Sequence, residues 1–277
     1  MRSARATRAM CTVATAVAIS SGLALADLPK PARPHPSTPA TYRSSVAKWH
    51  AIDPDGRAPL DGHGRPRLVL VSLNTGDRAE LDAASDGGGF AASDLDRAAY
   101  VLREPSSGNQ HPVEPRIVDL AYRIQMHFDA QEVRVISAYR TPRARNASNH
   151  GRGRAIDMVV PGVSDADVAD FARELGFVGV GIYPTSGFVH VDVRDRSYFW
   201  VDASAPGRRD RERAILGKLA AKSDEAAATR GERRVSPFAL ATDVDAAIRA
   251  HAESGATRDS DEDEDDDVTS TRGNDGR

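Results

Sequence analysis

The chain has 277 residues, of which 40% are hydrophobic and 28% charged, so most of it can bury a core. The formal net charge is only −3 and aromatic residues make up 5% of the sequence. No basic patch is interleaved with aromatic residues, so we expect no nucleic-acid partner. The length predicts one or two domains.

Residues 1–26 have the pattern of a secretory signal peptide. Three arginines precede a short apolar run at residues 10–19, and the small-x-small sequence of residues 24–26 is typical of a cleavage site. A membrane anchor is disfavoured, because a spanning helix needs about 20 apolar residues. We expect an exported protein, periplasmic or secreted, whose mature chain begins at Asp27 and has no stable membrane span. The only cysteine, Cys11, would be lost with the signal, so no disulfide is expected.

Residues 27–48 are rich in proline and predict a stiff, extended linker, with ordered structure beginning near Trp49. Residues 67–73 then predict a strand. The turn-forming sequence at residues 74–77 indicates a hairpin that returns through residues 78–81.

Two amphipathic helices are predicted next. The three glycines at residues 87–89 break the chain, and Ser93 opens a helix whose apolar face extends to Leu102. Pro115 opens a second helix that ends near Phe128, with apolar residues at helical spacing. His127 lies at the end of that helix, where a cation is favourable, so we interpret it as structural rather than as a metal ligand.

The central part of the chain predicts four strands and one helix. Residues 133–137 and 155–160 have strand character, and Ser164 caps a helix that ends at Gly176. Residues 179–183 and 188–193 are joined by a tight turn, so we expect them to form an antiparallel hairpin.

The composition changes after residue 205, so we predict a domain over residues 49–205 and a charged tail over residues 206–277. Residues 208–221 and 243–252 can form helices, although their apolar faces are thin. Residues 259–267 are an almost unbroken acidic run, which repels itself and predicts disorder.

Three residues of the central part form a pattern that suits a metal. His150 lies in a glycine-flanked loop, Asp157 lies on the strand that follows, and His190 lies on the last hairpin strand beside Asp192 on the same face. Two imidazoles and a carboxylate suit catalytic zinc, which keeps a fourth position open, although the ligand types do not exclude iron or manganese. From spacing alone, ordinary polar roles such as an ion pair between Asp157 and Arg154 are the alternative.

Five short segments, in this order, add a more specific pattern. They are Ile136–Pro142, Ser148–His150, Gly153–Asp157, Gly179–Pro184 and Ser186–Asp192. Together they resemble the zinc D-Ala-D-Ala carboxypeptidase superfamily, in its YcbK-like branch. The resemblance covers residues 133–192 strongly and extends weakly back to residue 67. It implies an α+β fold of the hedgehog/DD-peptidase type, with a small antiparallel sheet, flanking helices and Zn²⁺ held by His150, Asp157 and His190.

The same resemblance implies that Arg140 faces the site, after the strand that carries Ser137. A guanidinium there can hold a substrate carboxylate or a developing oxyanion, and the alternative is a surface arginine paired with an acid. We place Ser137 and Tyr183 with Arg140 as substrate-binding residues. Tyr183 can donate to an oxyanion, although packing is the commoner role of a strand tyrosine.

The chain departs from the better-known peptidases of this superfamily at one position. They carry an acid three residues before the second zinc histidine, and here that position is Gly187. The YcbK-like branch resembles this chain in lacking the acid. Asp192 is therefore the candidate catalytic base, and its alternative role is to orient His190.

The leading hypothesis is a zinc-dependent metallopeptidase or amidase of the D-Ala-D-Ala carboxypeptidase type, acting on peptidoglycan stem peptides. The alternative is a zinc-containing module that binds cell-wall peptides without cutting them. A serine hydrolase is disfavoured because the chain has no Gly-x-Ser-x-Gly motif. The sequence gives no indication of the oligomeric state.

Overall fold

The computed structural model describes residues 38–142, 148–206 and 213–234. The chain divides into two compact units, residues 1–30 and 31–277, and every described residue belongs to the second. The expected signal peptide, the tail helix at residues 243–252 and the acidic run at residues 259–267 lie outside the described residues. Among the described helices, none is long and apolar enough to cross a membrane.

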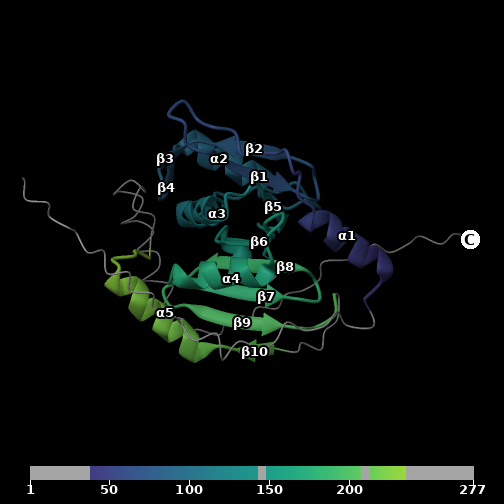
Figure 1. The fold of residues 1–277 in the computed structure, drawn as a ribbon, viewed down its shortest axis with the longest axis vertical. Helices are drawn as coiled ribbons and strands as arrows, with labels where there is room; N and C mark the ends of the chain where they lie inside the picture. Colours follow the sequence, from purple (N-terminus) through teal and green to yellow (C-terminus); the bar gives the residue numbers. More distant parts are fainter. Residues whose placement is uncertain (1–37, 143–147, 207–212, 235–277) are drawn as a thin grey trace, which may run out of the picture. The chain divides into compact units, whose positions relative to one another are not determined.

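An eight-stranded sheet organises the second unit, with the strand order β10-β9-β7-β8-β6-β5-β1-β2 (Figure 1). The strands are β1 (Leu68–Ser72), β2 (Arg78–Leu81), β5 (Val133–Ser137), β6 (Ala155–Val159), β7 (Val178–Tyr183), β8 (Phe188–Val193), β9 (Tyr198–Asp202) and β10 (Arg213–Ile215). Most neighbours are antiparallel, but β1 runs parallel to β5 and β7 runs parallel to β9. The α+β class is confirmed, although the sheet is larger and more mixed than expected.

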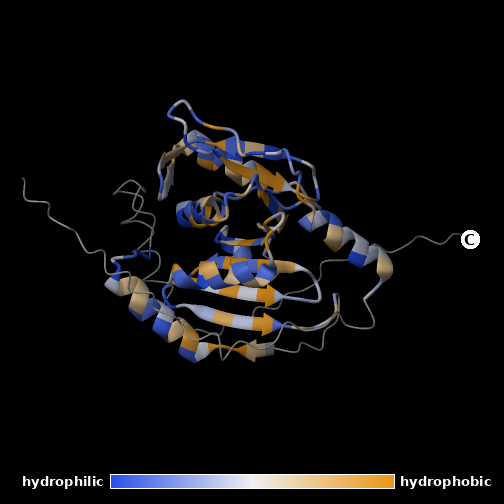
Figure 2. Cartoon of the chain, viewed as in Figure 1, coloured by the Kyte–Doolittle hydropathy of each residue, from blue (hydrophilic) through white to orange (hydrophobic). Residues whose placement is uncertain are grey.

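Helices cover the sheet on its hydrophobic face. They are α2 (Ala92–Val101), α3 (Pro115–His127) and α4 (Asp165–Glu174), and α5 (Gly217–Thr229) packs against α4 and β9. In Figure 2 these helices alternate between hydrophilic and hydrophobic residues, as expected when one side of a helix lies on a core. One core cluster includes Leu120 of α3, Val168 of α4 and Val191 of β8.

The alternation of side chains along β6 and β8 positions the site. Met158 and Val189 are fully buried in the core cluster. Their neighbours Asp157 and His190 therefore lie on the opposite face of the sheet. The register pairs Asp157 with His190 across β6 and β8, and pairs Ser137 of β5 with Asp157. Three adjacent strands thus bring polar side chains together on the face that the core does not use.

Ordered structure begins earlier than the sequence predicted. Helix α1 (Ala40–His50) occupies the end of the segment expected to be an extended linker, and Pro39 is its N-cap. The extended linker was predicted from the prolines of residues 29–39, whereas residues 40–50 contain no proline and can form a helix. The guanidinium of Arg134 donates to the carbonyl oxygens of Lys48, Trp49 and Ala51, which satisfies groups at the C-terminal end of the helix.

Two further expectations are corrected. The glycine-rich break is a small hairpin of β3 (Ala83–Ser85) and β4 (Gly88–Phe90), with the turn at residues 86–87. Gly88, which opens β4, has a φ of +109°, a conformation that favours glycine. Of the residues 208–221 expected to be helical, residues 208–212 lie outside the described residues, and residues 217–221 form the start of α5. Residues 213–215 instead form β10, which extends the sheet by pairing with β9.

Candidate metal centre

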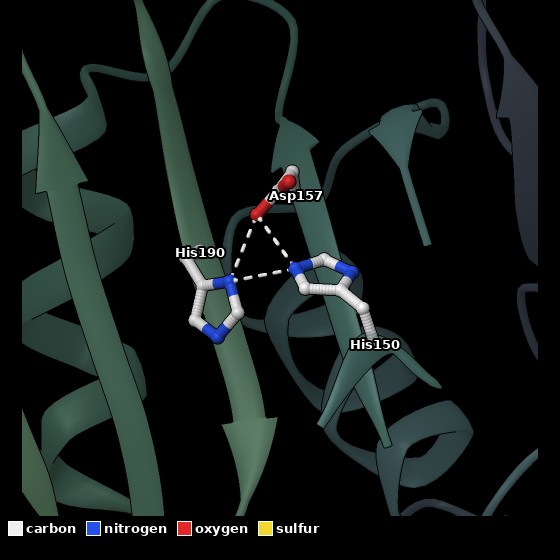
Figure 3. Close-up of side chains that lie close together, drawn as sticks. All are labelled: His150, Asp157 and His190. Carbon is white, nitrogen blue, oxygen red and sulfur yellow. Dashed lines mark hydrogen bonds and ion pairs between the residues drawn. The ribbon is translucent and has the colours of Figure 1, made fainter. Parts of the chain in front are cut away.

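Three buried side chains converge on the outer face of β6 and β8 (Figure 3). His190 Nδ1 lies 2.8 Å from Asp157 Oδ1 and 3.2 Å from His150 Nε2, and His150 Nε2 lies 3.5 Å from the same carboxylate oxygen. The three residues are only 3–4% exposed. Among the described residues, this is the group of histidine and acidic side chains whose geometry suits a metal ion.

Each imidazole is held by its outward nitrogen. His150 belongs to the short 3₁₀ helix η2 (His150–Arg152), and its Nδ1 donates to the carbonyl oxygen of Ala138 at 2.5 Å. A carbonyl oxygen can only accept, so the Nε2 atom of a neutral ring presents a lone pair to the cluster. His190 Nε2 contacts Asp192 Oδ2 at 2.9 Å, which leaves Nδ1 directed at Asp157. Anchoring of the outer nitrogen is the usual support of a metal-binding histidine.

Arg140 and Ser137 adjoin this cluster. The Nη2 atom of Arg140 donates to Asp157 Oδ2 at 2.7 Å and lies 3.1 Å from His150 Nε2. Its Nε atom donates to Ser137 Oγ at 3.0 Å. The Arg140 side chain is 26% exposed, so part of the guanidinium can meet a ligand. Arg140 is thus paired with an acid, which was the alternative to a substrate-binding role. That acid, however, is Asp157 of the metal cluster, so the guanidinium lies at the site.

Tyr183 contacts Trp200, which in turn lies beside His190 of the cluster. Its hydroxyl accepts a hydrogen bond from Trp200 Nε1 at 3.1 Å, and its ring stacks on Phe188 at 4.5 Å between centroids. The Trp200 ring lies 5.2 Å from that of His190. The structure therefore favours packing as the role of Tyr183. Trp200 is a further neighbour of His190 that the sequence pattern did not indicate.

Two glycines of β7 leave room for the large groups behind His190. A Cβ atom at Gly179 would lie 2.3 Å from the Asp192 carboxylate, and one at Gly181 would lie 2.3 Å from the Trp200 indole. Glycine inside a strand commonly marks such a close approach. The alternating glycines of this strand were the signal in the sequence that its outer face packs against bulky partners.

Asp192 is fully buried, and its carboxylate is surrounded by hydrogen-bond donors of the protein. One oxygen accepts from the Gly179 amide at 2.9 Å and from Arg194 Nε at 2.8 Å. The other contacts Arg194 Nη2 and His190 Nε2, each at 2.9 Å. A carboxylate has about four acceptor positions, and these four contacts use them. The geometry thus favours the role of orienting His190 over that of a base acting on water.

The charges of the cluster agree with this arrangement. Burial alone would raise the pKa of Asp192, but the charge of Arg194 and the contact with His190 hold it far below its usual value. Burial would also raise the pKa of Asp157, but His150, His190 and Arg140 keep it well below its usual value. A carboxylate with so low a pKa is a weak proton acceptor and a ready partner for a cation.

His190 shows the opposite shift. Burial lowers its pKa, but hydrogen bonds to Asp157 and Asp192 outweigh this effect and raise the pKa to about 10. Without a metal, a positive charge thus lies between the two carboxylates. A bound cation at Nδ1 would take the place of that proton, which is how metal binding and protonation compete at histidine ligands.

Comparison with known proteins agrees with the resemblance. The family model described as peptidoglycan L,D-endopeptidase MepK matches residues 63–198. The probable peptidoglycan L,D-endopeptidase MepK of Haemophilus influenzae is 33% identical over 163 residues, which are 53% of this chain and 86% of that protein. The peptidoglycan L,D-endopeptidase MepK of Escherichia coli K12 is 30% identical over 141 residues, 46% of this chain and 77% of that protein.

No solved structure matches the chain at a significant level. The two relatives are nonetheless covered over most of their length, and the family model spans β1 to the start of β9 with the whole His-Asp-His cluster. The chain therefore belongs to the peptidoglycan L,D-endopeptidase MepK family, within the zinc D-Ala-D-Ala carboxypeptidase-like superfamily.

Proposed function

We propose that this protein is a zinc-dependent peptidase that cleaves peptidoglycan stem peptides. The observation that carries the proposal is the convergence of His150 Nε2, Asp157 Oδ1 and His190 Nδ1 at separations of 2.8–3.5 Å. Donor atoms bound to tetrahedral zinc at about 2.0–2.1 Å are roughly 3.3 Å apart, so the three residues fit a zinc ion with one position left open. The names of the relatives support the substrate class.

The relatives also bear on which bond is cut. They are named L,D-endopeptidases, whereas the sequence pattern had led us to expect a D-Ala-D-Ala carboxypeptidase. We therefore propose an internal L,D-type bond as the target. An endopeptidase substrate continues on both sides of the cleaved bond. Arg140 would then meet a carboxylate of the stem peptide or the oxyanion of the attacked carbonyl, rather than a C-terminal D-alanine alone.

Each residue around the site would have a separate role in catalysis. Zinc, when bound, supplies a Lewis acid that polarises the scissile carbonyl and lowers the pKa of a bound water. Asp192 and the Ala138 carbonyl orient the two histidines. Arg140 donates hydrogen bonds to negative charge on the substrate or on the attacked carbonyl.

No side-chain base stands at the superfamily's usual position. Gly187 occupies it, and a Cβ atom there would lie 2.3 Å from Val46 of α1. General-base help typically contributes about 10²–10⁴-fold, so its loss predicts slow rather than absent turnover. This feature favours the second candidate function, a zinc-containing module that binds cell-wall peptides without cutting them.

Incubation of the zinc-loaded protein with purified muropeptides, followed by mass spectrometry, separates the two functions. We expect products cut at an L,D-type bond. We expect Arg140→Ala to lower kcat/KM by about 10²–10³-fold with zinc retained, because it removes a donor to developing charge. Arg140→Lys restores the charge but not the paired donors, so a partial effect is expected.

Arg152→Ala is the matched control, since Arg152 is exposed in the same loop region. Muropeptides that bind to zinc-loaded protein but are never cut, with cross-linked and uncross-linked substrates alike, would establish the binding module instead.

We also propose that the protein is exported and acts in the periplasm or outside the cell. The signal-like residues 1–26 and the cell-wall substrate support this location. The peptidase domain would extend beyond the expected residues 49–205, because α1 begins at Ala40 and both β10 and α5 pack against β9. N-terminal sequencing of protein from the envelope or the medium should begin at or near Asp27. An intact Met1 on protein recovered from the cytoplasm would contradict export.

A further inference from the structure

One face of helix α1 contacts a single turn of the peptidase domain. Tyr42, Val46 and His50 are spaced four residues apart, so they lie on one side of the helix. The Tyr42 hydroxyl donates to the carbonyl oxygen of Ser186 at 3.0 Å. His50 Nε2 lies 3.1 Å from the carbonyl oxygen of Gly187, and Val46 packs against Gly187 itself. A carbonyl only accepts, so His50 carries its proton on Nε2.

The turn that α1 contacts leads directly into the strand of His190. It connects β7 to β8, and the amides of Ser186 and Gly187 both donate to the carbonyl oxygen of Tyr183, at 3.0 and 2.7 Å. Gly187 has a φ of +74°, a conformation that residues with side chains rarely adopt. It offers no side chain with which to hold the turn. The Thr185 hydroxyl of the turn donates to the Ala203 carbonyl oxygen at 2.8 Å, and the contacts from α1 add support at Ser186 and Gly187.

Helix α1 is in turn fixed to the rest of the domain. Arg134 holds its C-terminal carbonyl groups, and the Gly162 amide donates to the His50 carbonyl oxygen at 3.0 Å. Asp165 at the start of α4 lies 3.7 Å from His50 Nε2. Arg134 pairs with Val159 in the sheet, two residues after Asp157 on the same face. The helix thus borders the face that carries the metal cluster.

We propose that α1 is a positioning element of the metal centre, and that His50 is its principal positioning residue. The inference rests on the proposed zinc peptidase function and adds an element that precedes the family-matched residues 63–198. A ligand histidine must be held within about 0.5 Å of its working position, and small displacements of reacting groups are costly. His50 acts on His190 through the backbone of the turn and the first residues of β8.

Three variants test the role of His50. His50→Leu removes the donor to Gly187, whereas His50→Gln retains an N–H donor of similar reach. His63→Leu is the matched control, because His63 is exposed and lies outside these contacts. The measurements are apparent zinc affinity by chelator competition, kcat and KM per folded molecule on a muropeptide, and thermal unfolding.

We expect His50→Leu to weaken zinc binding by about 3- to 10-fold and to lower kcat by about tenfold, with little change in KM. His50→Gln should restore both quantities to within about threefold of the wild type, and His63→Leu should change neither. A role in stability alone would lower the melting temperature and leave zinc affinity and kcat per folded molecule unchanged, which overturns the proposal. Equal losses in the Leu and Gln variants overturn it as well.

If His50→Leu does not fold, Tyr42→Phe gives the same test, because it removes only the hydroxyl that holds Ser186. A smaller loss of zinc affinity and kcat in this variant supports the proposal, and wild-type values overturn it. A wild-type protein that binds no zinc would refute the proposed function together with this inference. A wild type that binds and cleaves normally beside unaffected variants would refute this inference alone.

Discussion

Replacement of His190 by alanine should abolish stoichiometric zinc binding. The change removes one of the three converging donor atoms and leaves His150 and Asp157 as a two-residue site. Loss of a residue that merely orients a ligand costs about 10–100-fold in metal affinity, so loss of a ligand should cost more. Metal analysis after dialysis should find about one zinc per wild-type chain and a residual trace in the variant.

His190→Ala should also lower the free energy of unfolding, and this effect must be separated from the loss of metal. His190 is buried between Asp157 and Asp192, so alanine leaves two buried carboxylates without their shared partner. Breaking a buried charge pair typically costs about 3–5 kcal/mol. The thermal unfolding of metal-free wild type and metal-free His190→Ala should therefore be measured in addition to their zinc content. His63→Ala, at an exposed histidine, is the control. Full zinc retention in a folded His190→Ala protein would refute the ligand set.

Strand periodicity was enough to predict one part of the site. Alternation along residues 188–193 placed His190 and Asp192 on one face, and the structure has their side chains 2.9 Å apart. The hairpin of β7 and β8 and the helix from Pro115 also follow the sequence pattern closely. These features depend on local periodicity and on turn residues, which a single sequence displays directly.

The rest of the site depends on which strands become neighbours. β6 lies between β5 and β8, and this order pairs Asp157 with both Ser137 and His190. No local pattern encodes that order, so residue types and spacing left ordinary polar roles open for Asp157 and His190, and the resemblance was what favoured a shared metal site. Arg194 and Trp200 were missed for the same reason, because their contacts with Asp192 and His190 depend on tertiary packing.

Helix α1 shows a different limit of the sequence. Its residues have no strong amphipathic pattern, and none of them is fully buried. Tyr42 and His50 instead contact two carbonyl oxygens of a turn far along the chain. The identity of the turn that lies beside this helix depends on tertiary packing, and the preceding prolines favoured an extended segment. The correct boundary follows only from the tertiary structure.

Asp192→Asn should distinguish a base from an orienting residue. Asparagine has nearly the same shape, but only its oxygen accepts, and its amide group presents two donors where the carboxylate had acceptors. Asp192 receives four hydrogens from Gly179, Arg194 and His190, so the amide must oppose some of these donors. The surrounding geometry predicts that His190 loses its outer anchor, which should weaken zinc binding by about 10–100-fold.

Turnover at saturating zinc then decides between the two roles. If Asp192 only orients His190, the zinc-saturated variant should keep kcat within about threefold of the wild type. If Asp192 is the general base, kcat should fall by about 10²–10⁴-fold even when the site is full. Asp195→Asn is the matched control, because Asp195 is exposed only three residues away. We expect the first result, since the Asp192 carboxylate is fully buried and its acceptor positions are already used. Unchanged zinc affinity together with a large fall in kcat would restore the role of base.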